Sequence, residues 1–380
     1  FPTLTYPVHT SIVTGVSSNR HGILSNTVFR PQNGPTSDWY WFANRIQVPT
    51  LWERARKAGR TVAIVRWPAS VGAEVDWFVP EIFGSPGFNF GADWQLIQQH
   101  SRKELMDEVL EDSGLSVTKG HQSLKELDRF TVHAARRLLE AHHPELMLVH
   151  LVNLDFVQHL TGRASPETHA ALQEMDRLIG QLLASVDLQR TNIVLLGDHG
   201  FLDFNKVVAV NVLFKEQGWL ETDGARLKSW KVVAHAESGQ AAIYLAPGTD
   251  IEFGQQVLEL LRKSAPGRYT ILDRKELDRL EAYPGALCAL EAVPGFALES
   301  SLVDAFEVEL KAAKGAHGHL PSRPELRAGF IAAGPAVSRS GDLGEILVLD
   351  VAPTIASVLG LESAPSAVEF QGRVLNLNAD

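Results

Sequence analysis

The sequence has only one cysteine, no block of basic residues and no long apolar run, and each scarcity excludes a class of protein. A single thiol, Cys288, forms no intramolecular disulfide, so a disulfide framework is excluded. No apolar run approaches the roughly 20 residues that span a bilayer. The formal net charge is −10 and no basic face stands out, which argues against a nucleic-acid polymer as partner. A protein of this charge that handles phosphate must obtain positive charge elsewhere, and bound metal is the obvious source.

The pattern of helices and strands indicates an α/β fold. The 380 residues suffice for one large α/β domain, or for a core with a smaller inserted domain. The expected helices cover residues 51–59, 124–141, 166–182 and 351–359. The expected strands cover residues 61–65, 146–151, 193–196 and 329–333. Their alternation predicts a mainly parallel sheet with helices on both faces.

Residues 206–316 have a different pattern. They contain a strand at 241–245, an amphipathic helix through Val257 and Leu261, and several turn-rich joints. We interpret this region as an insertion or cap. The core is then formed by residues 1–205 and 317–380. The sequence shows no internal repeat and no low-complexity segment.

Two groups of polar residues follow predicted buried strands. Asp155 and His159 come after the strand at 146–151, and Asp198 and His199 come directly after the strand at 193–196. Ligands of parallel sheets bind beyond the carboxyl ends of the strands. Residues four apart share one face of a helix, and carboxylate with imidazole suits zinc, manganese or iron. Asp198 and His199 are expected at a sharp turn, with Gly200 giving the backbone room to bend. A cap or a hydrogen-bonded turn is the alternative for each pair.

The first residues of the sequence contain a candidate nucleophile. Pro7 can open a short helix that Gly15 ends, which leaves Thr5 just before the helix N-terminus. The helix dipole and the free N–H groups there favour an anion. A threonine hydroxyl is a poor nucleophile unless a base or a metal lowers its pKa. A simple helix cap is the alternative for Thr5.

Five motifs in a fixed order give the chain a family resemblance. The first two are Pro2-Thr-Leu-Thr5-Tyr-Pro7, followed by Val13-Thr-Gly15, and Arg20-His-Gly-Ile23-Leu-Ser-Asn26. The later ones are Leu154-Asp155 to His159, Gly197-Asp198-His199-Gly200, and Gly315-Ala-His317-Gly318, before a last helix that ends at Leu359-Gly360. Together they resemble bacterial nucleotide pyrophosphatase/phosphodiesterases, a branch of the alkaline phosphatase superfamily. The resemblance implies an alkaline-phosphatase-like three-layer sandwich.

The resemblance also implies two divalent metal ions, with zinc (Zn²⁺) as the expected element. The ligands that it assigns to the first ion are Asp155, His159 and His317. The ligands that it assigns to the second are Asp198, His199 and the hydroxyl oxygen of Thr5. His319 is the rival of His317, and His317 is preferred because the family pattern places a glycine directly after the ligand. Asn26 is expected to donate a hydrogen bond to a non-bridging phosphoryl oxygen beside the Thr5 amide.

Two features depart from the family pattern. Val8 stands where the family usually has asparagine, which affects the subfamily more than the chemistry. The family's second metal also takes an aspartate from a strand upstream of the nucleophile. The sequence begins at Phe1, so either the chain extends further or the second site lacks one ligand. We expect the aspartate to precede Phe1 in the full-length protein, as would any signal peptide.

These residues predict a metal-dependent hydrolase of phosphodiester or pyrophosphate bonds in small nucleotide-like substrates. Thr5 would form a covalent phospho-threonine intermediate. A phosphonoacetate hydrolase and a phosphomonoesterase are the alternative enzymes, although Asn26 is neutral where monoesterases typically place a cation. A metal-binding protein without turnover is the alternative of another class.

Overall fold

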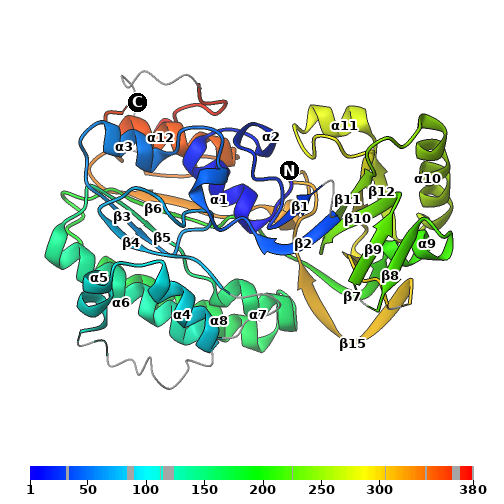
Figure 1. Cartoon of the computed structure of the whole chain (residues 1–380). Coiled ribbons are helices and arrows are strands. Elements are labelled where there is room, and N and C mark those ends of the chain that lie inside the picture. The colour runs from blue at the N-terminus through cyan, green and yellow to red at the C-terminus, as the bar shows by residue number, and fades with distance from the viewer. Residues whose placement is uncertain are drawn as a thin grey trace.

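The computed structural model describes all residues except 31–33, 84–89, 112, 114–123, 225, 304, 339, 362–368 and 379–380. Figure 1 shows two bodies side by side. One gathers elements from both ends of the chain, and the other is built from the middle of the chain. No described helix is both long and apolar enough to cross a membrane.

The first body is built around a central layer made of a three-stranded sheet and a two-stranded sheet. Strand β3 (Val62–Val65) pairs in parallel with β4 (Trp77–Val79) and with β5 (Leu146–Val149). Strand β6 (Ile193–Leu196) pairs with β16 (Phe330–Ala333) in the antiparallel direction. The predicted α/β class and the predicted core strands are confirmed, with the β6–β16 pair as an antiparallel exception.

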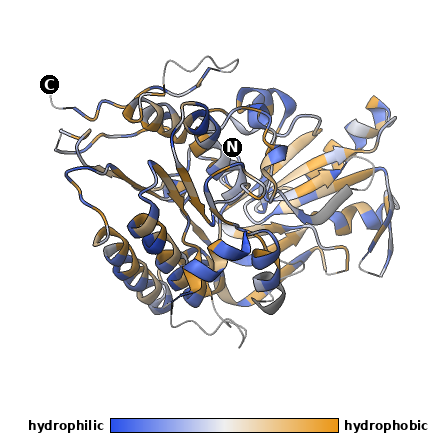
Figure 2. Ribbon diagram, turned by 60° about the vertical axis from the view of Figure 1, so that its left-hand side comes forward, coloured by the Kyte–Doolittle hydropathy of each residue, from blue (hydrophilic) through white to orange (hydrophobic). Residues whose placement is uncertain are grey.

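Helices cover this central layer on both sides, which makes three layers (Figure 1). The helices on the upper side are α1 (Thr5–Thr14), α2 (Ser18–His21), α3 (Leu51–Lys57) and α12 (Val351–Val358). Those on the lower side are α4 (Phe90–Gln99), α5 (Lys103–Leu110), α6 (Leu124–His142), α7 (Asn153–Thr161) and α8 (Pro166–Leu183). Successive strand residues point to opposite faces, so Val62 and Ile64 join the core cluster with α1 and α3, while Ala63 and Val65 join the one with α6. Apolar residues accordingly fill the middle of the sandwich in Figure 2.

The caps explain where the helices begin. Thr50 accepts a hydrogen bond from the Glu53 amide in a capping box at the start of α3. Helix α1 begins at Thr5, with Leu4 as N-cap, so the prediction that Pro7 opens it was wrong. The first amides of a helix have no intrahelical acceptor, so Pro7 fits within the first turn without losing a bond. Thr5 is therefore the first residue of the helix itself.

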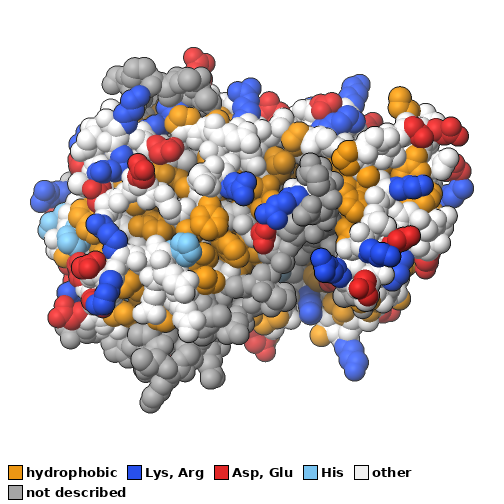
Figure 3. Space-filling model, in the orientation of Figure 1, with side chains coloured by type: hydrophobic (Ala, Val, Ile, Leu, Met, Phe, Trp, Pro, Cys, Tyr) orange, Lys and Arg blue, Asp and Glu red, His pale blue; other side chains and the backbone are white. Residues whose placement is uncertain are grey.

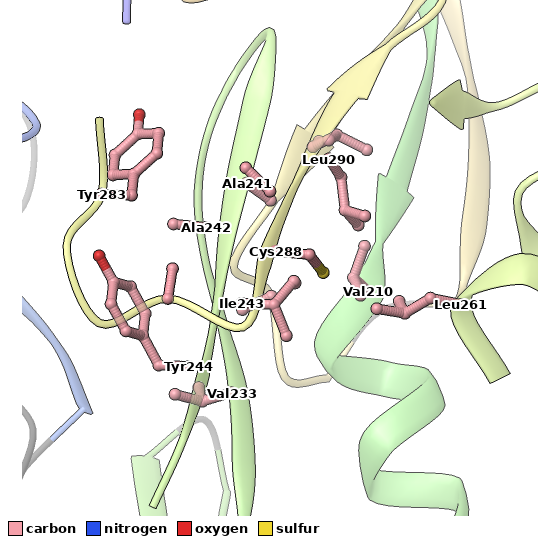
Figure 4. Close-up of a cluster of buried hydrophobic side chains, with 14 of the residues drawn as sticks. Val210, Val233, Ala241, Ala242, Ile243, Tyr244, Leu261, Tyr283, Cys288 and Leu290 are labelled. Carbon is pink, nitrogen blue, oxygen red and sulfur yellow. The ribbon is translucent and has the colours of Figure 1, made fainter. Parts of the chain in front are cut away.

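The second body has its own sheet and core. Its antiparallel sheet has the order β10-β11-β13-β12, formed by β10 (Val232–Glu237), β11 (Gln240–Leu245), β12 (Tyr269–Leu272) and β13 (Cys288–Ala292). Its helices and its small hairpin are α9 (Val210–Glu216), α10 (Ile251–Ser264), α11 (Arg274–Arg279), β8 (Leu220–Asp223) and β9 (Arg226–Trp230). Figure 4 shows Ile243, Leu261 and Cys288 in one buried cluster. Cys288 is thus a small core residue.

Two further groups of strands connect the bodies. Strand β7 (Leu202–Ala209) lies between β14 (Gly295–Glu299), which runs parallel to it, and β15 (Glu307–Ala316), which runs antiparallel. The hairpin of β1 (Thr27–Arg30) and β2 (Gly34–Trp39) belongs to the first body by sequence and approaches the second body in Figure 1. The division at residues 206 and 316 stays a prediction. On the face shown in Figure 3, acidic and basic side chains are interspersed.

Candidate functional site

Thr5 occupies the N-terminus of α1. Its Oγ1 lies 3.4 Å from His199 Nε2, and its backbone amide has no acceptor among the described residues. The next amide, that of Tyr6, donates to Asn26 Oδ1 at 2.9 Å, and Pro7 has no N–H to offer. The Thr5 amide is therefore the free donor at a helix end where the dipole favours an anion.

The end of β6 places Asp198 and His199 beside Thr5. Asp198 Oδ2 lies 3.1 Å from His199 Nε2 and 3.5 Å from His9 Nδ1. Burial alone would raise the pKa of Asp198, but the attraction of His199 and His9 outweighs it and holds this pKa well below its ordinary value. Burial alone would lower the pKa of His199, and Asp198 raises it instead. Asp198 is thus an ionised carboxylate at the site.

Helix α7 and the end of β15 supply the second group of candidate ligands. Asp155 and His159 share one face of α7, with Oδ2 and Nε2 3.6 Å apart, as their spacing predicts. His317 Nε2 lies 3.1 Å from His159 Nε2 and 3.8 Å from Asp155 Oδ1. Burial and the neighbouring His199 and His159 lower the pKa of His317 well below its ordinary value. The imidazole of His317 is therefore neutral, which is the form that binds a metal.

The hydrogen bonds of these histidines fit a cation. His159 Nδ1 donates to the Gly315 carbonyl at 3.0 Å, and His317 Nδ1 donates to the Thr3 carbonyl at 2.9 Å. Both Nε2 atoms then carry lone pairs and face each other. Asp155 Oδ1 is buried and has no hydrogen-bond partner in the part of the chain that the structure describes. Metal-binding histidines commonly donate their second nitrogen to a carbonyl in this way, so the residues present suit a divalent metal ion.

The two predicted ligand sets form one continuous cluster. Asp155, His199 and His317 each offer an atom within 4.8 Å of the others. His319 lies outside this cluster: it is fully buried, and neither of its ring nitrogens has a hydrogen-bond partner among the described residues. The choice of His317 over His319 as a ligand and the division of the ligands between two ions stay predictions.

Asn26 lies against the start of α1. Its Oδ1 accepts the Tyr6 amide, and its side chain is 9% exposed. Its Nδ2 donates no hydrogen bond among the described residues and is therefore available to a ligand. The role of Asn26 as a donor to a phosphoryl oxygen stays a prediction.

A cavity of about 70 Å³ opens beside Thr5 and Asp155. Its walls are mainly apolar and aromatic, and include Trp39 and Phe83. The buried ion pair of Arg66 and Glu81 lines one side, with Nη2 and Oε2 2.5 Å apart. The cavity can accept an organic group attached to a phosphorus atom at Thr5.

The sequence analysis did not single out His9, although it lies beside Thr5 and Asp198. Its Nδ1 donates to the Thr5 carbonyl at 2.8 Å, and its ring packs edge-on against His150, with centroids 4.5 Å apart. His9 comes four residues after Thr5, and this spacing places the two residues on one face of a helix. The spacing was informative only if the helix begins at Thr5, as it does in the structure.

The reason predicted for Gly200 was also wrong. Gly200 does not adopt a positive φ, and a Cβ at this position would overlap the carbonyl oxygen of Glu325. Gly200 is therefore required by the close approach of a second segment and not by a bend.

Comparisons with known proteins agree with this geometry. The family profile "Type I phosphodiesterase / nucleotide pyrophosphatase" matches residues 1–303. An uncharacterized pyrophosphatase/phosphodiesterase of Schizosaccharomyces pombe is 24% identical over 397 residues, which cover 98% of this chain and 71% of that protein. Ectonucleotide pyrophosphatase/phosphodiesterase family member 1 of Mus musculus is 24% identical over 219 residues, which cover 53% of this chain and 19% of that protein.

Solved structures share the fold. Murine ectonucleotide pyrophosphatase / phosphodiesterase 5 has a TM-score of 0.64 at 21% identity, covering 97% of this chain and 87% of its own. Phosphonoacetate hydrolase from Sinorhizobium meliloti 1021, in complex with phosphonoformate, has a TM-score of 0.60 at 23% identity, covering 87% of this chain and 79% of its own. The predicted alkaline-phosphatase-like fold is confirmed. Because the family profile covers most of the sequence, this chain belongs to the type I phosphodiesterase/nucleotide pyrophosphatase family of hydrolases.

Proposed function

We propose that this chain hydrolyses phosphodiester or pyrophosphate bonds of small nucleotide-like substrates, with Thr5 as the nucleophile. The observation that carries the proposal is the position of Thr5 Oγ1, 3.4 Å from His199 Nε2 at the free N-terminus of α1. The family is metal-dependent, and the cluster around His317 suits a cation. The acidic net charge of −10 adds to the need for bound positive charge.

The proposed metal sites use the residues of the cluster. One divalent ion would be held by Asp155, His159 and His317, and a second by Asp198, His199 and the oxygen of Thr5, with zinc as the expected element. When bound, such ions lower the pKa of a hydroxyl and stabilise charge on phosphoryl and leaving oxygens.

The protein's own groups carry the remaining chemistry. Thr5 Oγ1 attacks phosphorus as the bond to the leaving oxygen breaks in line, which gives a phospho-threonine. Water then attacks this phosphorus, breaks its bond to Thr5 and releases the phosphate product. The Thr5 amide and Asn26 Nδ2 donate hydrogen bonds to the non-bridging oxygens, where charge accumulates in the transition state.

The neutral donor Asn26 favours diesters over monoesters. A phosphodiester carries one negative charge, whereas a phosphomonoester carries about two near neutral pH because its second pKa is about 6. The mainly apolar cavity beside Thr5 suits the organic group of an ester. We therefore propose small phosphate diesters as substrates, with no nucleic-acid polymer as partner. Residues 206–316 are proposed to form a cap beside the site.

A parallel assay tests the substrate class. An aryl phosphodiester, the matching aryl monoester and phosphonoacetate are compared with the wild type and with Asn26→Ala. The diester is expected to give the highest kcat/KM, and Asn26→Ala is expected to lower it by about 10²-fold, the usual effect of losing one transition-state donor. A preference for the monoester or for phosphonoacetate would contradict the phosphodiesterase assignment. Stoichiometric metal without turnover of any substrate would favour a binding protein.

A further inference from the structure

One carboxylate of the second body contacts the backbone that carries Asn26. Glu237, the last residue of β10, accepts four hydrogen bonds from the segment Ser25 to Thr27. Its Oε2 accepts from Ser25 Oγ at 2.8 Å and from the Asn26 amide at 2.9 Å. Its Oε1 accepts from the Thr27 amide at 2.8 Å and from Thr27 Oγ1 at 2.5 Å.

The Glu237 side chain is a hydrogen-bond acceptor at both of its oxygens. Each oxygen of Glu237 accepts two donors, and two of the four donors are backbone amides that cannot reverse their direction. Because the Thr27 hydroxyl donates to Glu237, its oxygen is free to accept from His235 Nε2 at 2.8 Å. Among the described residues, Glu237 also lies near the same histidine, with Oε1 3.7 Å from His235 Nε2. The side chain of Glu237 is thus held mainly by hydrogen-bond donors.

Two further hydrogen bonds hold Asn26, in addition to its contact with Glu237. The Asn26 carbonyl accepts the Tyr40 amide at 3.1 Å, and Asn26 Oδ1 accepts the Tyr6 amide at 2.9 Å. The backbone of Asn26 is therefore held on its amide side by Glu237 and on its carbonyl side by Tyr40, the residue after β2. With Oδ1 committed to the Tyr6 amide of α1, Nδ2 is the remaining hydrogen-bond donor of the Asn26 side chain.

We propose that Glu237 is a positioning residue that holds Asn26 in register with the N-terminus of α1. Through it, the region 206–316 contributes to phosphoryl-oxygen binding without touching the substrate. The inference rests on the proposed function in one respect, the role of Asn26 as a phosphoryl donor. Its structural part, the fixed conformation of Ser25 to Thr27, is independent of any reaction.

A merely structural role is distinguishable because other contacts hold the two bodies together. The ring of Phe29 in β1 stacks on Tyr244 of β11, with centroids 3.9 Å apart and planes within 15°. Phe29 also stacks on His235 at 5.8 Å. Removal of the Glu237 carboxylate leaves this apolar contact in place. The variants are therefore expected to fold, with a change confined to the segment that Glu237 holds.

The test is a double-mutant cycle of Glu237→Ala and Asn26→Ala, with the aryl phosphodiester as substrate. Glu237→Ala is expected to lower kcat by at least about 10-fold with a smaller change in KM, because a transition-state donor is misplaced. In the Glu237→Ala background, Asn26→Ala is expected to cost at most about 10-fold, against about 10²-fold in the wild type, so that the double variant is no worse than Asn26→Ala alone. Glu237→Gln, which keeps one amide acceptor, is expected to fall between. Independent, multiplying effects of the two substitutions would overturn the proposal.

Glu291→Gln is the matched control. Glu291 is a buried carboxylate of the same sheet that accepts hydrogen bonds from the Leu320 amide and from Arg323. Among the described residues it makes no hydrogen bond with Asn26. Glu291→Gln is expected to lower stability without a loss of kcat and without coupling to Asn26→Ala. A kcat loss in Glu291→Gln equal to that of Glu237→Ala would show a general stability effect and overturn the positioning role.

Hydrogen exchange separates this proposal from the proposed function. The Asn26 and Thr27 amides are expected to exchange at least about 10-fold faster in Glu237→Ala than in the wild type, whether or not any substrate is turned over. Inorganic phosphate binding is expected to weaken in Glu237→Ala and in Asn26→Ala, with no further loss in the double variant. An inactive wild type that shows both effects would contradict only the hydrolase assignment. Unchanged exchange of both amides would overturn the role of Glu237.

Discussion

His199 and His317 stack face to face at the centre of the candidate site, with ring centroids 3.6 Å apart and planes within 11°. The pKa of His199 is raised by Asp198 despite burial, whereas burial and the neighbouring His199 lower the pKa of His317. Two stacked imidazoles in a buried site cannot both be charged without strong repulsion. A bound cation would satisfy the free nitrogens without charging both rings.

Metal binding is expected to depend on His317 and not on His319. A chelator is expected to abolish activity, and added zinc is expected to restore it. His317→Ala is expected to remove the metal held with Asp155 and His159, because its Nε2 lies 3.1 Å from that of His159. Metal per folded chain, measured by elemental analysis after gel filtration, checks this.

His319→Ala is the matched control for this prediction. This substitution also truncates a buried histidine, but the ring of His319 has no hydrogen-bond partner among the described residues. It is expected to retain the metal, with a loss of stability at most. Equal metal loss in the two variants would mean that the ligand is assigned to the wrong histidine or that both bind.

Thr5→Ala is expected to abolish turnover, because the nucleophilic oxygen is lost. Thr5→Ser keeps the hydroxyl and is expected to retain measurable activity. Thr14→Ala is the control, since the buried Thr14 hydroxyl only donates to the Thr10 carbonyl in the same helix. It is expected to cost about 1 kcal/mol of stability and to leave kcat unchanged. Mass spectrometry of acid-quenched enzyme should detect phosphate on Thr5; steady turnover by Thr5→Ala would exclude the residue as nucleophile.

His21 is expected to make the fold sensitive to acid. Burial lowers its pKa from 6.5 to about 3, and its Nδ1 accepts the Ile23 amide while Nε2 contacts Ser11 Oγ at 3.1 Å. Below pH 6.5 the unfolded chain therefore binds a proton that the folded chain does not. This lowers the free energy of unfolding by about 2 kcal/mol at pH 5 relative to pH 8, and the loss grows until about pH 3.

Urea unfolding at pH 8 and pH 5 measures this contribution. His21→Gln is expected to show a pH dependence smaller by about 2 kcal/mol than that of the wild type. His169→Gln, at an exposed position of α8, is expected to keep the wild-type pH dependence. The same dependence in His21→Gln as in the wild type would contradict the assignment.

Local patterns predicted much of the fold and part of the site. Strand β6 has the expected bounds, and the spacing of Asp155 and His159 placed them on one face of α7. Both features depend on residues a few positions apart, where periodicity and capping determine the conformation.

Contacts between distant segments were not predictable from such patterns. The approach of His317 to His159 depends on how the end of β15 packs against α7, which periodicity does not encode. The role of Glu237 requires β10 to meet a loop of the first body. The family resemblance identified His317 because a motif retains the result of packing, whereas Glu237 lies outside the quoted motifs.

The last prediction concerns Gly200, which follows the candidate ligand His199. Its amide donates to the Leu326 carbonyl at 3.0 Å, and a Cβ at this position would overlap the Glu325 carbonyl. Gly200→Ala must therefore separate the loop after β6 from residues 324–326. We expect it to cost about 1–3 kcal/mol of stability, as overpacking does, and to lower both metal content and kcat by displacing His199. Gly180→Ala is the matched control, because Gly180 is an exposed residue of α8 with free space at its Cβ, and it is expected to stabilise the fold by up to about 1 kcal/mol. Thermal unfolding, elemental analysis and diesterase assays of the two variants check this. Wild-type metal content and kcat in Gly200→Ala would show that the close approach is not needed to place His199.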